Sequence, residues 1–294
     1  MFKRALIIID GQNDFTEGGL SKTGIQVQPG TLPVTDGFSA LERVADLIEK
    51  KNGFFDSIIC TLDSHHYYHV AHQLPWIDSK NVHPSPYTMI NELDVCGPKP
   101  IWFAANGMRQ VGDGKGGKMS IQKKLEQYVT KLGKATRNGQ PRYPLIIWPY
   151  HCIIGTPGAC LNPALDLALK NYEIKKNWPI NKVTKGSWLY SEHYSALKAE
   201  VVDDADPMTQ LNTYLVQVFN TFDEIYWSGL AEDFCLANTW RDAIDELGLD
   251  AGKKMKIISD GTAAVNPMGT TTMVDNFRNE AKAAGVEFIK CNDI

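Results

Sequence analysis

The stretch DEIYWSGLAEDFCLANTWR, residues 223–241, decides the fold because it joins a buried strand to a helix through a turn of small residues. The apolar run 225–227 is typical of a strand. From Asp233 onward the apolar residues recur at helical spacing until Gly248. Cys235 therefore lies at the predicted start of a helix, where the helix dipole and the backbone N–H groups favour a thiolate. It is either a nucleophile or, like most free cysteines, a small buried apolar residue.

Strand and helix patterns alternate along the rest of the chain. Apolar runs typical of buried strands cover 5–9, 57–62, 145–147, 180–183, 255–259 and 286–290. Apolar residues at helical spacing predict helices over 36–52, 121–132, 162–172, 209–220 and 270–284. This alternation predicts an α/β fold, a doubly wound and mostly parallel sheet of about six strands with helices on both faces.

Residues 1–294 are expected to form a single domain that carries an insertion at about 76–144. The insertion has several prolines in its first half, and its GDGKGGK run, residues 112–118, is typical of a flexible turn. That run lacks the GxxxxGK[ST] spacing of a phosphate-binding loop and follows no buried strand. We expect the insertion to form either a lid or a contact between the subunits of a homo-oligomer.

The composition excludes several classes of partner. The chain has a net charge of −4 and a pI near 6.0, which disfavours general binding to nucleic acid or to an anionic membrane. No apolar run is long enough to span a bilayer, and the run in MFKRALIIID is too short for a signal peptide. The six cysteines form no CxxC pair, so we expect reduced thiols in a cytoplasmic protein.

Two charged residues directly follow predicted strands. Asp10 follows the strand 5–9, at the edge where open α/β sheets bind ligands, although an Asx turn or a helix cap would also account for it. Lys185 comes just past the strand 180–183, where a lysine is usually solvated.

Histidines gather directly after the strand 57–62, in the run DSHHYYHVAH of residues 63–72. Asp63 and His65 lie on one side of an extended segment, so both can face the same ion. Such a mixed carboxylate and imidazole set suits Zn, Fe or Mn. The alternative is a solvated, histidine-rich loop.

The remaining histidines of this run are less constrained by spacing. His69 is a further candidate ligand, whereas His66 and His72 are expected to point elsewhere if the segment stays extended. His151 follows the strand 145–147 and is a candidate third ligand of the same ion, with an ordinary loop histidine as the alternative.

These candidates share one topological property. Asp10, Asp63, His151, Lys185 and Cys235 each follow a predicted strand. Because ligands bind at the carboxyl ends of the strands in open α/β sheets, we expect the five side chains to gather on one edge of the sheet.

Five segments together carry a resemblance to a known family. They are IIIDGQNDF (7–15), TLDSHHYYH (61–69), WPYHCIIGTPGA (148–159), TKGSW (184–188) and SGLAEDFCLANTWRDA (228–243). In this order they resemble the nicotinamidases of the isochorismatase-like cysteine hydrolase superfamily, over nearly the whole chain apart from the insertion.

The resemblance implies a catalytic triad of Asp10, Lys185 and Cys235. Lys185 would lower the pKa of the thiol, and Asp10 would accept the thiol proton and later deliver it to the leaving nitrogen. The backbone N–H groups of Ala231 and Cys235 would form the oxyanion hole. A non-proline cis peptide is implied between Leu230 and Ala231, with Leu230 among the substrate-binding residues.

The resemblance also implies one divalent metal ion held by Asp63, His65 and His151. His69 matches a position that approaches the ion in some members of the family. Zn is the first choice, and Fe or Mn are alternatives because the ligand set is mixed.

The implied activity is hydrolysis of nicotinamide to nicotinate and ammonia through a cysteine thioester, in the recycling of nicotinamide toward NAD. Phe15 and Trp148 match the aromatic walls around the pyridine ring, whose nitrogen would bind the metal. The alternatives are an amidase of the same superfamily acting on a pyrazinamide-like, ureido or N-carbamoyl compound, and a non-catalytic binding protein of the same fold. The chain departs from the family in its long insertion and in His66, where proline is common.

Overall fold

Six parallel strands form the central sheet of the computed structural model, which describes residues 2–51, 53–134, 136–137, 140–141, 144–266 and 271–294. Their order across the sheet is β13 (Asn181–Lys185), β4 (Ser57–Asp63), β1 (Arg4–Ile9), β14 (Glu224–Leu230), β15 (Met255–Ala263) and β16 (Glu287–Ile289). All five neighbouring pairs are parallel. The predicted doubly wound, mostly parallel sheet is therefore confirmed.

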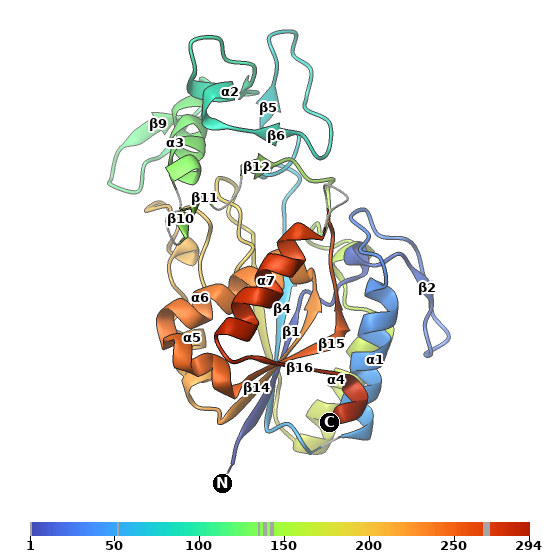
Figure 1. Cartoon of the computed structure of the whole chain (residues 1–294). Helices are drawn as coiled ribbons and strands as arrows, with labels where there is room; N and C mark the ends of the chain where they lie inside the picture. Colours follow the sequence, from blue (N-terminus) through green and yellow to red (C-terminus); the bar gives the residue numbers. More distant parts are fainter. Residues whose placement is uncertain (1, 52, 135, 138–139, 142–143, 267–270) are drawn as a thin grey trace.

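Helices cover both faces of this sheet (Figure 1). Helices α1 (Gly37–Lys50) and α4 (Pro163–Lys176) pack together on one face. The other face carries α5 (Thr213–Asn220), α6 (Ala237–Leu247) and α7 (Thr272–Ala283). The run Ala5 to Ile9 of the central strand β1 is fully buried, because helices cover it from both sides.

A second group of small elements lies beyond the carboxyl edge of the sheet, at the top of Figure 1. It contains β5 (Trp76–Ile77), β6 (Met89–Ile90), α2 (Glu92–Cys96), β7 (Phe103–Ala104), β8 (Gln110–Gly112), β9 (Lys118–Ser120), α3 (Ile121–Lys134), β10 (Thr136–Arg137), β11 (Gln140–Pro141) and β12 (Leu145–Ile146). The GDGKGGK run forms the turn of the β8–β9 hairpin, where the carboxylate of Asp113 accepts the N–H groups of Lys115 and Gly117. Most of the predicted insertion thus has regular structure, but its limits and its status within one domain remain predictions.

The strand predicted at 145–147 does not join the central sheet. Strand β12 pairs antiparallel with β6 in a separate two-stranded sheet. The expectation that His151 follows a strand of the main sheet is therefore wrong. A short apolar run indicates burial, but it does not specify the partner strand.

Several element boundaries also differ from the prediction. Helix α5 begins at Thr213 rather than at 209, because the Asn212 side chain caps it by accepting the N–H of Leu215, 3.0 Å away. The predicted helix from Asp233 begins as a π-helical turn, Glu232–Leu236, before α6. The predicted helix end at Asn52 and start at Thr270 lie outside the described residues.

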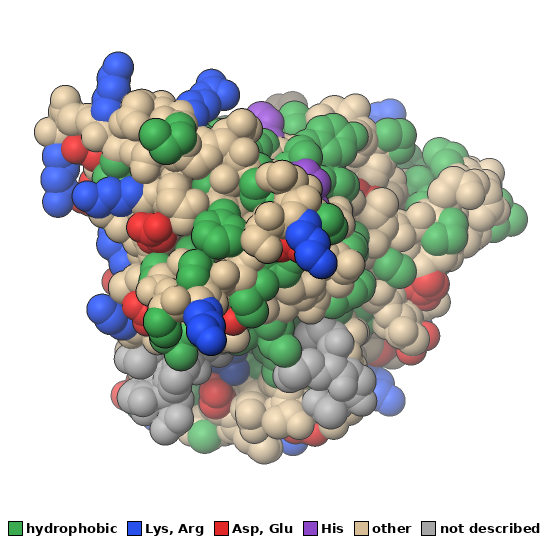
Figure 2. Space-filling model, turned by 90° about the horizontal axis from the view of Figure 1, so that it is seen from above, with side chains coloured by type: hydrophobic (Ala, Val, Ile, Leu, Met, Phe, Trp, Pro, Cys, Tyr) green, Lys and Arg blue, Asp and Glu red, His purple; other side chains and the backbone are tan. Residues whose placement is uncertain are grey.

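The surface at the top of the molecule is shown in Figure 2. Lys and Arg side chains lie mainly at the left of this view, the side of α3 and β9 in Figure 1, and hydrophobic side chains are spread over the middle. In the part of the chain that the structure describes, no helix has both the length and the apolar character needed to cross a membrane.

Candidate active site

Three side chains from three different strand ends meet at the carboxyl edge of the sheet. The Nζ atom of Lys185 lies 2.8 Å from Oδ2 of Asp10 and 3.4 Å from Sγ of Cys235. All three residues are buried, with at most 6% of their surface exposed. The acid, the amine and the thiol predicted from the sequence are thus in direct contact.

Asp10 is held in an unusual backbone conformation at the end of β1. Its φ angle is +43°, in the left-handed region that few residues other than glycine adopt. Thr61 on the neighbouring strand fixes it twice, since its hydroxyl accepts the N–H of Asp10 at 3.1 Å and donates to Oδ1 at 2.6 Å. This clamp directs the other carboxylate oxygen toward Lys185, and the sequence analysis did not identify Thr61.

Cys235 lies in the π-helical turn that follows β14. Strand β14 approaches β1 closely at Gly229, which has a φ of +104°. A Cβ at this position would lie 2.0 Å from the carbonyl oxygen of Ile9. The peptide bond between Leu230 and Ala231 is cis, as the family resemblance implies. The carbonyl oxygen of Cys235 accepts the hydroxyl of Thr239 at 2.7 Å, which ties the turn to α6.

Burial and charge together set the protonation of these groups. Burial disfavours the ammonium of Lys185, but the carboxylates of Asp10 and Asp63 outweigh it and raise the lysine pKa well above its ordinary value. Burial raises the pKa of Asp10, and Lys185 opposes this effect. Burial also raises the pKa of Cys235 well above its ordinary value, although Lys185 acts to lower it. This direction is opposite to the lowered thiol pKa expected from the sequence, because desolvation acts on the sulfur more strongly than the nearby cation does.

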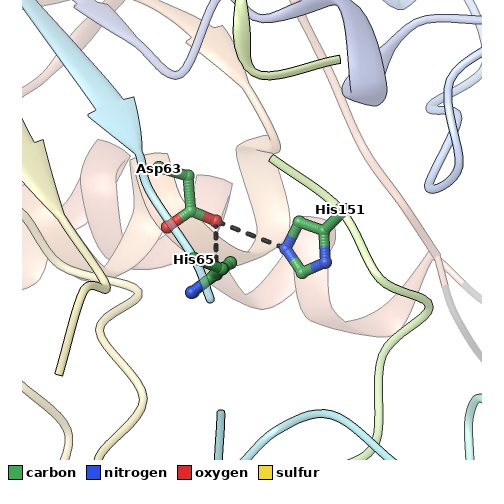
Figure 3. Close-up of side chains that lie close together, drawn as sticks. All are labelled: Asp63, His65 and His151. Carbon is green, nitrogen blue, oxygen red and sulfur yellow. Dashed lines mark ion pairs between the residues drawn. The ribbon is translucent and has the colours of Figure 1, made fainter. Parts of the chain in front are cut away.

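A second cluster lies directly beside the first and shares Lys185 with it. Oδ2 of Asp63 lies 3.0 Å from Nε2 of His65 and 3.3 Å from Nε2 of His151 (Figure 3). Oδ1 of the same carboxylate lies 3.1 Å from Nζ of Lys185. The ligand atoms of Asp63, His65 and His151 are close enough to one another to hold one metal ion.

The hydrogen bonds of the two histidines leave the correct nitrogen for a metal. Nδ1 of His65 donates to the carbonyl of Gly186 at 2.8 Å, and Nδ1 of His151 donates to the carbonyl of Pro149 at 2.8 Å. Carbonyl oxygens only accept, so Nδ1 carries a hydrogen in each ring, and Nε2 is the nitrogen that a neutral ring would offer to a metal. Only glycine fits at position 186, because a Cβ there would lie 2.7 Å from Asp63 Oδ1. The residues present therefore fit a metal with mixed nitrogen and oxygen ligands.

Two further groups extend this donor set. The His69 ring lies 4.3 Å from that of His65, and among the described residues its buried Nε2 has no hydrogen-bond partner. His69, His65 and the buried carboxylate of Glu192 form a second group with metal-binding geometry. Glu192 could not be predicted from the sequence, because it lies in an irregular loop after β13 without motif or periodicity.

His72 lies beside this cluster, because the extended segment on which its prediction depended is not present. Its ring lies 5.2 Å from that of His65, and the side chain is fully buried. The chain turns after His66, with a hydrogen bond from the N–H of His72 to the carbonyl of His69, so the extended segment assumed from the sequence ends early. His66 itself is exposed.

A narrow cavity of about 20 Å³ lies beside the thiol and the metal-type cluster. Its described lining residues are Phe15, Leu32, Asp63, Trp148, His151, Glu192, Tyr194, Ala231, Phe234, Cys235 and Val265. The lining is largely aromatic and apolar with a few convergent polar groups, as in small-molecule sites. The chemistry of this lining suits a small, flat molecule next to a nucleophile.

Six of the eleven predicted site residues line this cavity; the five absent from the described lining are Asp10, His65, His69, Lys185 and Leu230. Leu230 is fully buried at the end of β14 and is absent from the described lining. Tyr194, Phe234 and Val265 line the cavity without having been predicted. Phe234 could have been predicted, because it directly precedes Cys235. Tyr194 and Val265 could not, because they lie in irregular segments.

The predicted insertion contributes none of the described lining residues. Instead it supports the loop that carries Glu192 and Tyr194. The Tyr128 hydroxyl of α3 accepts the N–H of Glu192 at 3.4 Å, and Nζ of Lys124 lies 2.7 Å from Oδ1 of Asp203.

Comparisons with known proteins agree on one family. No family model matches the chain. A nicotinamidase from Acinetobacter baylyi is 25% identical over 290 residues, which cover 99% of this chain and 94% of that protein. A nicotinamidase/pyrazinamidase from Mycobacterium tuberculosis is 30% identical over 152 residues, 52% of this chain and 67% of that protein. The solved structure of a nicotinamidase/pyrazinamidase from Acinetobacter baumannii superposes with a TM-score of 0.58 at 20% identity, over 100% of this chain and 98% of that one, and thus shares its fold.

Proposed function

This chain belongs to the nicotinamidase family of isochorismatase-like cysteine hydrolases, and we propose that it hydrolyses nicotinamide to nicotinate and ammonia. The observation that carries this proposal is the contact of Asp10, Lys185 and Cys235 beside an aromatic cavity and a metal-type cluster. The related proteins named above are nicotinamidases, two of them also pyrazinamidases, which supports an aromatic carboxamide as substrate.

The proposed reaction begins at the sulfur of Cys235. Asp10 accepts the thiol proton while the sulfur forms a bond to the carboxamide carbon, and the ammonium of Lys185 stabilises the sulfur as it becomes negative. The raised pKa of Asp10 suits this role, because burial leaves a carboxylate that readily takes up a proton.

The tetrahedral intermediate then collapses to a thioester. The C–N bond breaks, and the proton on Asp10 passes to the leaving nitrogen, which departs as ammonia. Water adds to the thioester, Asp10 takes up its proton, and nicotinate leaves with regeneration of the thiol. The backbone N–H groups of Ala231 and Cys235 are proposed to bind the oxyanion in both halves; one such donor typically contributes about 3 kcal/mol.

Asp63, His65 and His151 are proposed to hold a divalent metal ion, with His69 and Glu192 as further donors. Bound there, the ion would offer a Lewis-acid site for the pyridine nitrogen and so favour one orientation of the ring. Three imidazoles with carboxylates suit Zn first, and Fe or Mn as alternatives. Phe15 and Trp148 would form the walls against the ring faces, and aromatic contacts of this kind favour a flat heterocycle.

The test is ammonia release from a panel of amides, with metal analysis of the same sample. We expect turnover of nicotinamide by the wild type and none by Cys235→Ala, because no other described thiol lines the cavity. Cys96→Ala is the matched control, since this exposed cysteine on α2 lies outside the site, and it should keep full activity.

The alternatives give different results in the same assay. Turnover confined to ureido or N-carbamoyl compounds would indicate another amidase of the superfamily. Binding of nicotinamide without ammonia release from any amide would indicate a non-catalytic protein. A cytoplasmic location, the lack of nucleic-acid or membrane partners and a homo-oligomer remain predictions.

A further inference from the structure

The proposed reaction gives roles to Asp10 and Phe15 of the segment IIIDGQNDF but none to Gln12 and Asp14. Gln12 is 99% buried, and its side-chain amide makes three hydrogen bonds. The amide oxygen accepts the N–H of Asp63 at 2.7 Å, and the amide nitrogen donates to the carbonyls of Asp63 at 2.7 Å and Ala159 at 3.0 Å. Gln12 thus binds both the N–H and the carbonyl of Asp63, as the backbone of a neighbouring strand would.

Asp14 contacts the segment that carries His151, another of the proposed metal ligands. Its carboxylate is buried and accepts the N–H of Cys152 at 2.7 Å and the N–H of Thr31 at 3.2 Å. Cys152 directly follows His151, and its φ of +47° lies in the left-handed region. The carboxylate therefore stabilises the strained turn that directs His151 toward Asp63.

The same carboxylate also links two walls of the cavity. Phe15 follows Asp14 in the chain, and Leu32 follows Thr31; both line the cavity. The fit around Asp14 is tight, because a Cβ on Gly158 would lie 2.1 Å from its Oδ2.

We propose that Gln12 and Asp14 are positioning residues that hold the two segments of the metal site, Asp63 and His151, in register. This inference rests on the metal site of the proposed function. Neither side chain reaches the ion itself, so both act through the backbone of the ligands. Loss of such outer partners typically weakens metal affinity about 10–100-fold.

The test compares near-isosteric variants of both residues. Asp14→Asn keeps the shape but turns one acceptor into a donor that faces an N–H group. Gln12→Leu keeps most of the volume and removes all three hydrogen bonds. Gly158→Ala is a third variant, which displaces the Asp14 carboxylate without altering any hydrogen-bonding group.

Two matched controls lose hydrogen bonds of the same kind elsewhere. Asp78→Leu removes a carboxylate whose Oδ1 accepts the N–H groups of Lys80 and Val82. Gln122→Leu removes an amide that accepts the N–H of Ala104. Both control residues lie in the predicted insertion and away from the described cavity lining.

The readout is the dissociation constant of Zn²⁺, measured on metal-free protein by competition with a chromogenic chelator, together with the melting temperature. We expect Asp14→Asn, Gln12→Leu and Gly158→Ala to raise this constant about 10–100-fold, and the controls to leave it within about twofold. A constant within about twofold of the wild type in all three site variants that fold would overturn the inference. Absence of Zn²⁺ binding by the wild type would refute the proposed metal site instead, and this inference with it.

Discussion

Replacing Lys185 with methionine removes the cation that the two buried clusters share. Its Nζ lies 2.8 Å from Asp10 Oδ2, 3.1 Å from Asp63 Oδ1 and 3.4 Å from Cys235 Sγ, and only 1% of the side chain is exposed. Methionine is similar in length and apolar, so the packing is largely kept while the charge is lost. Two buried carboxylates then face each other without the cation between them.

The magnitude follows from this geometry. Breaking a buried ion pair by removing one partner costs about 3–5 kcal/mol, because the remaining charge stays desolvated. For a chain of 294 residues, this corresponds to a fall in melting temperature of roughly 5–8 °C. The double variant Asp10→Asn with Lys185→Met removes one of the two buried carboxylate charges that have lost the lysine. Its free energy of unfolding should exceed that of Lys185→Met by about 1–3 kcal/mol.

Activity should fall further than stability alone explains. Losing a preorganised charge beside a developing thiolate typically lowers kcat about 100–1000-fold. Arg4→Met is the control, because this cation is also partly buried and paired, with Glu224 at 2.9 Å, but lies at the opposite end of β1 from Asp10. Both variants should lose stability in urea unfolding, and only Lys185→Met should lose ammonia release. Equal activity in the two variants at a temperature where both are folded would refute the reasoning.

The remaining predictions concern the substrate, the pH profile and the metal. Trp148→Ala should raise KM for nicotinamide about 10-fold with a smaller change in kcat, because it removes one aromatic wall; an unchanged KM would exclude this wall from the binding site. Because burial raises the pKa of Asp10 and the reaction needs its carboxylate, kcat/KM should fall as pH drops through a value above 3.8, the ordinary pKa of aspartate, and an acid limb at or below 3.8 would contradict the assignment. Removal of the metal by a chelator should weaken nicotinamide binding in calorimetry more than it lowers the melting temperature, whereas unfolding on chelation would indicate a structural ion.

The sequence by itself determined the fold class and the main candidates for the chemistry. Apolar runs such as 5–9 and 225–227 are typical of strands that helices cover on both faces in a parallel sheet. Because parallel strands end at a common edge, Asp10, Asp63, Lys185 and Cys235 were expected together without any distance. Their order and motifs also carried the resemblance to the nicotinamidases, which the comparisons support.

Only the tertiary structure decided what irregular segments do. Strand β12 pairs with β6 rather than with the main sheet, His72 turns inward, and Glu192 and Tyr194 reach the cavity from a loop with no periodic pattern. Their positions depend on contacts between residues far apart in the chain, such as Tyr128 with Glu192, that no local spacing encodes. The direction of the Cys235 pKa shift was decided in the same way, because desolvation depends on everything packed around the sulfur and here outweighs the charge of Lys185.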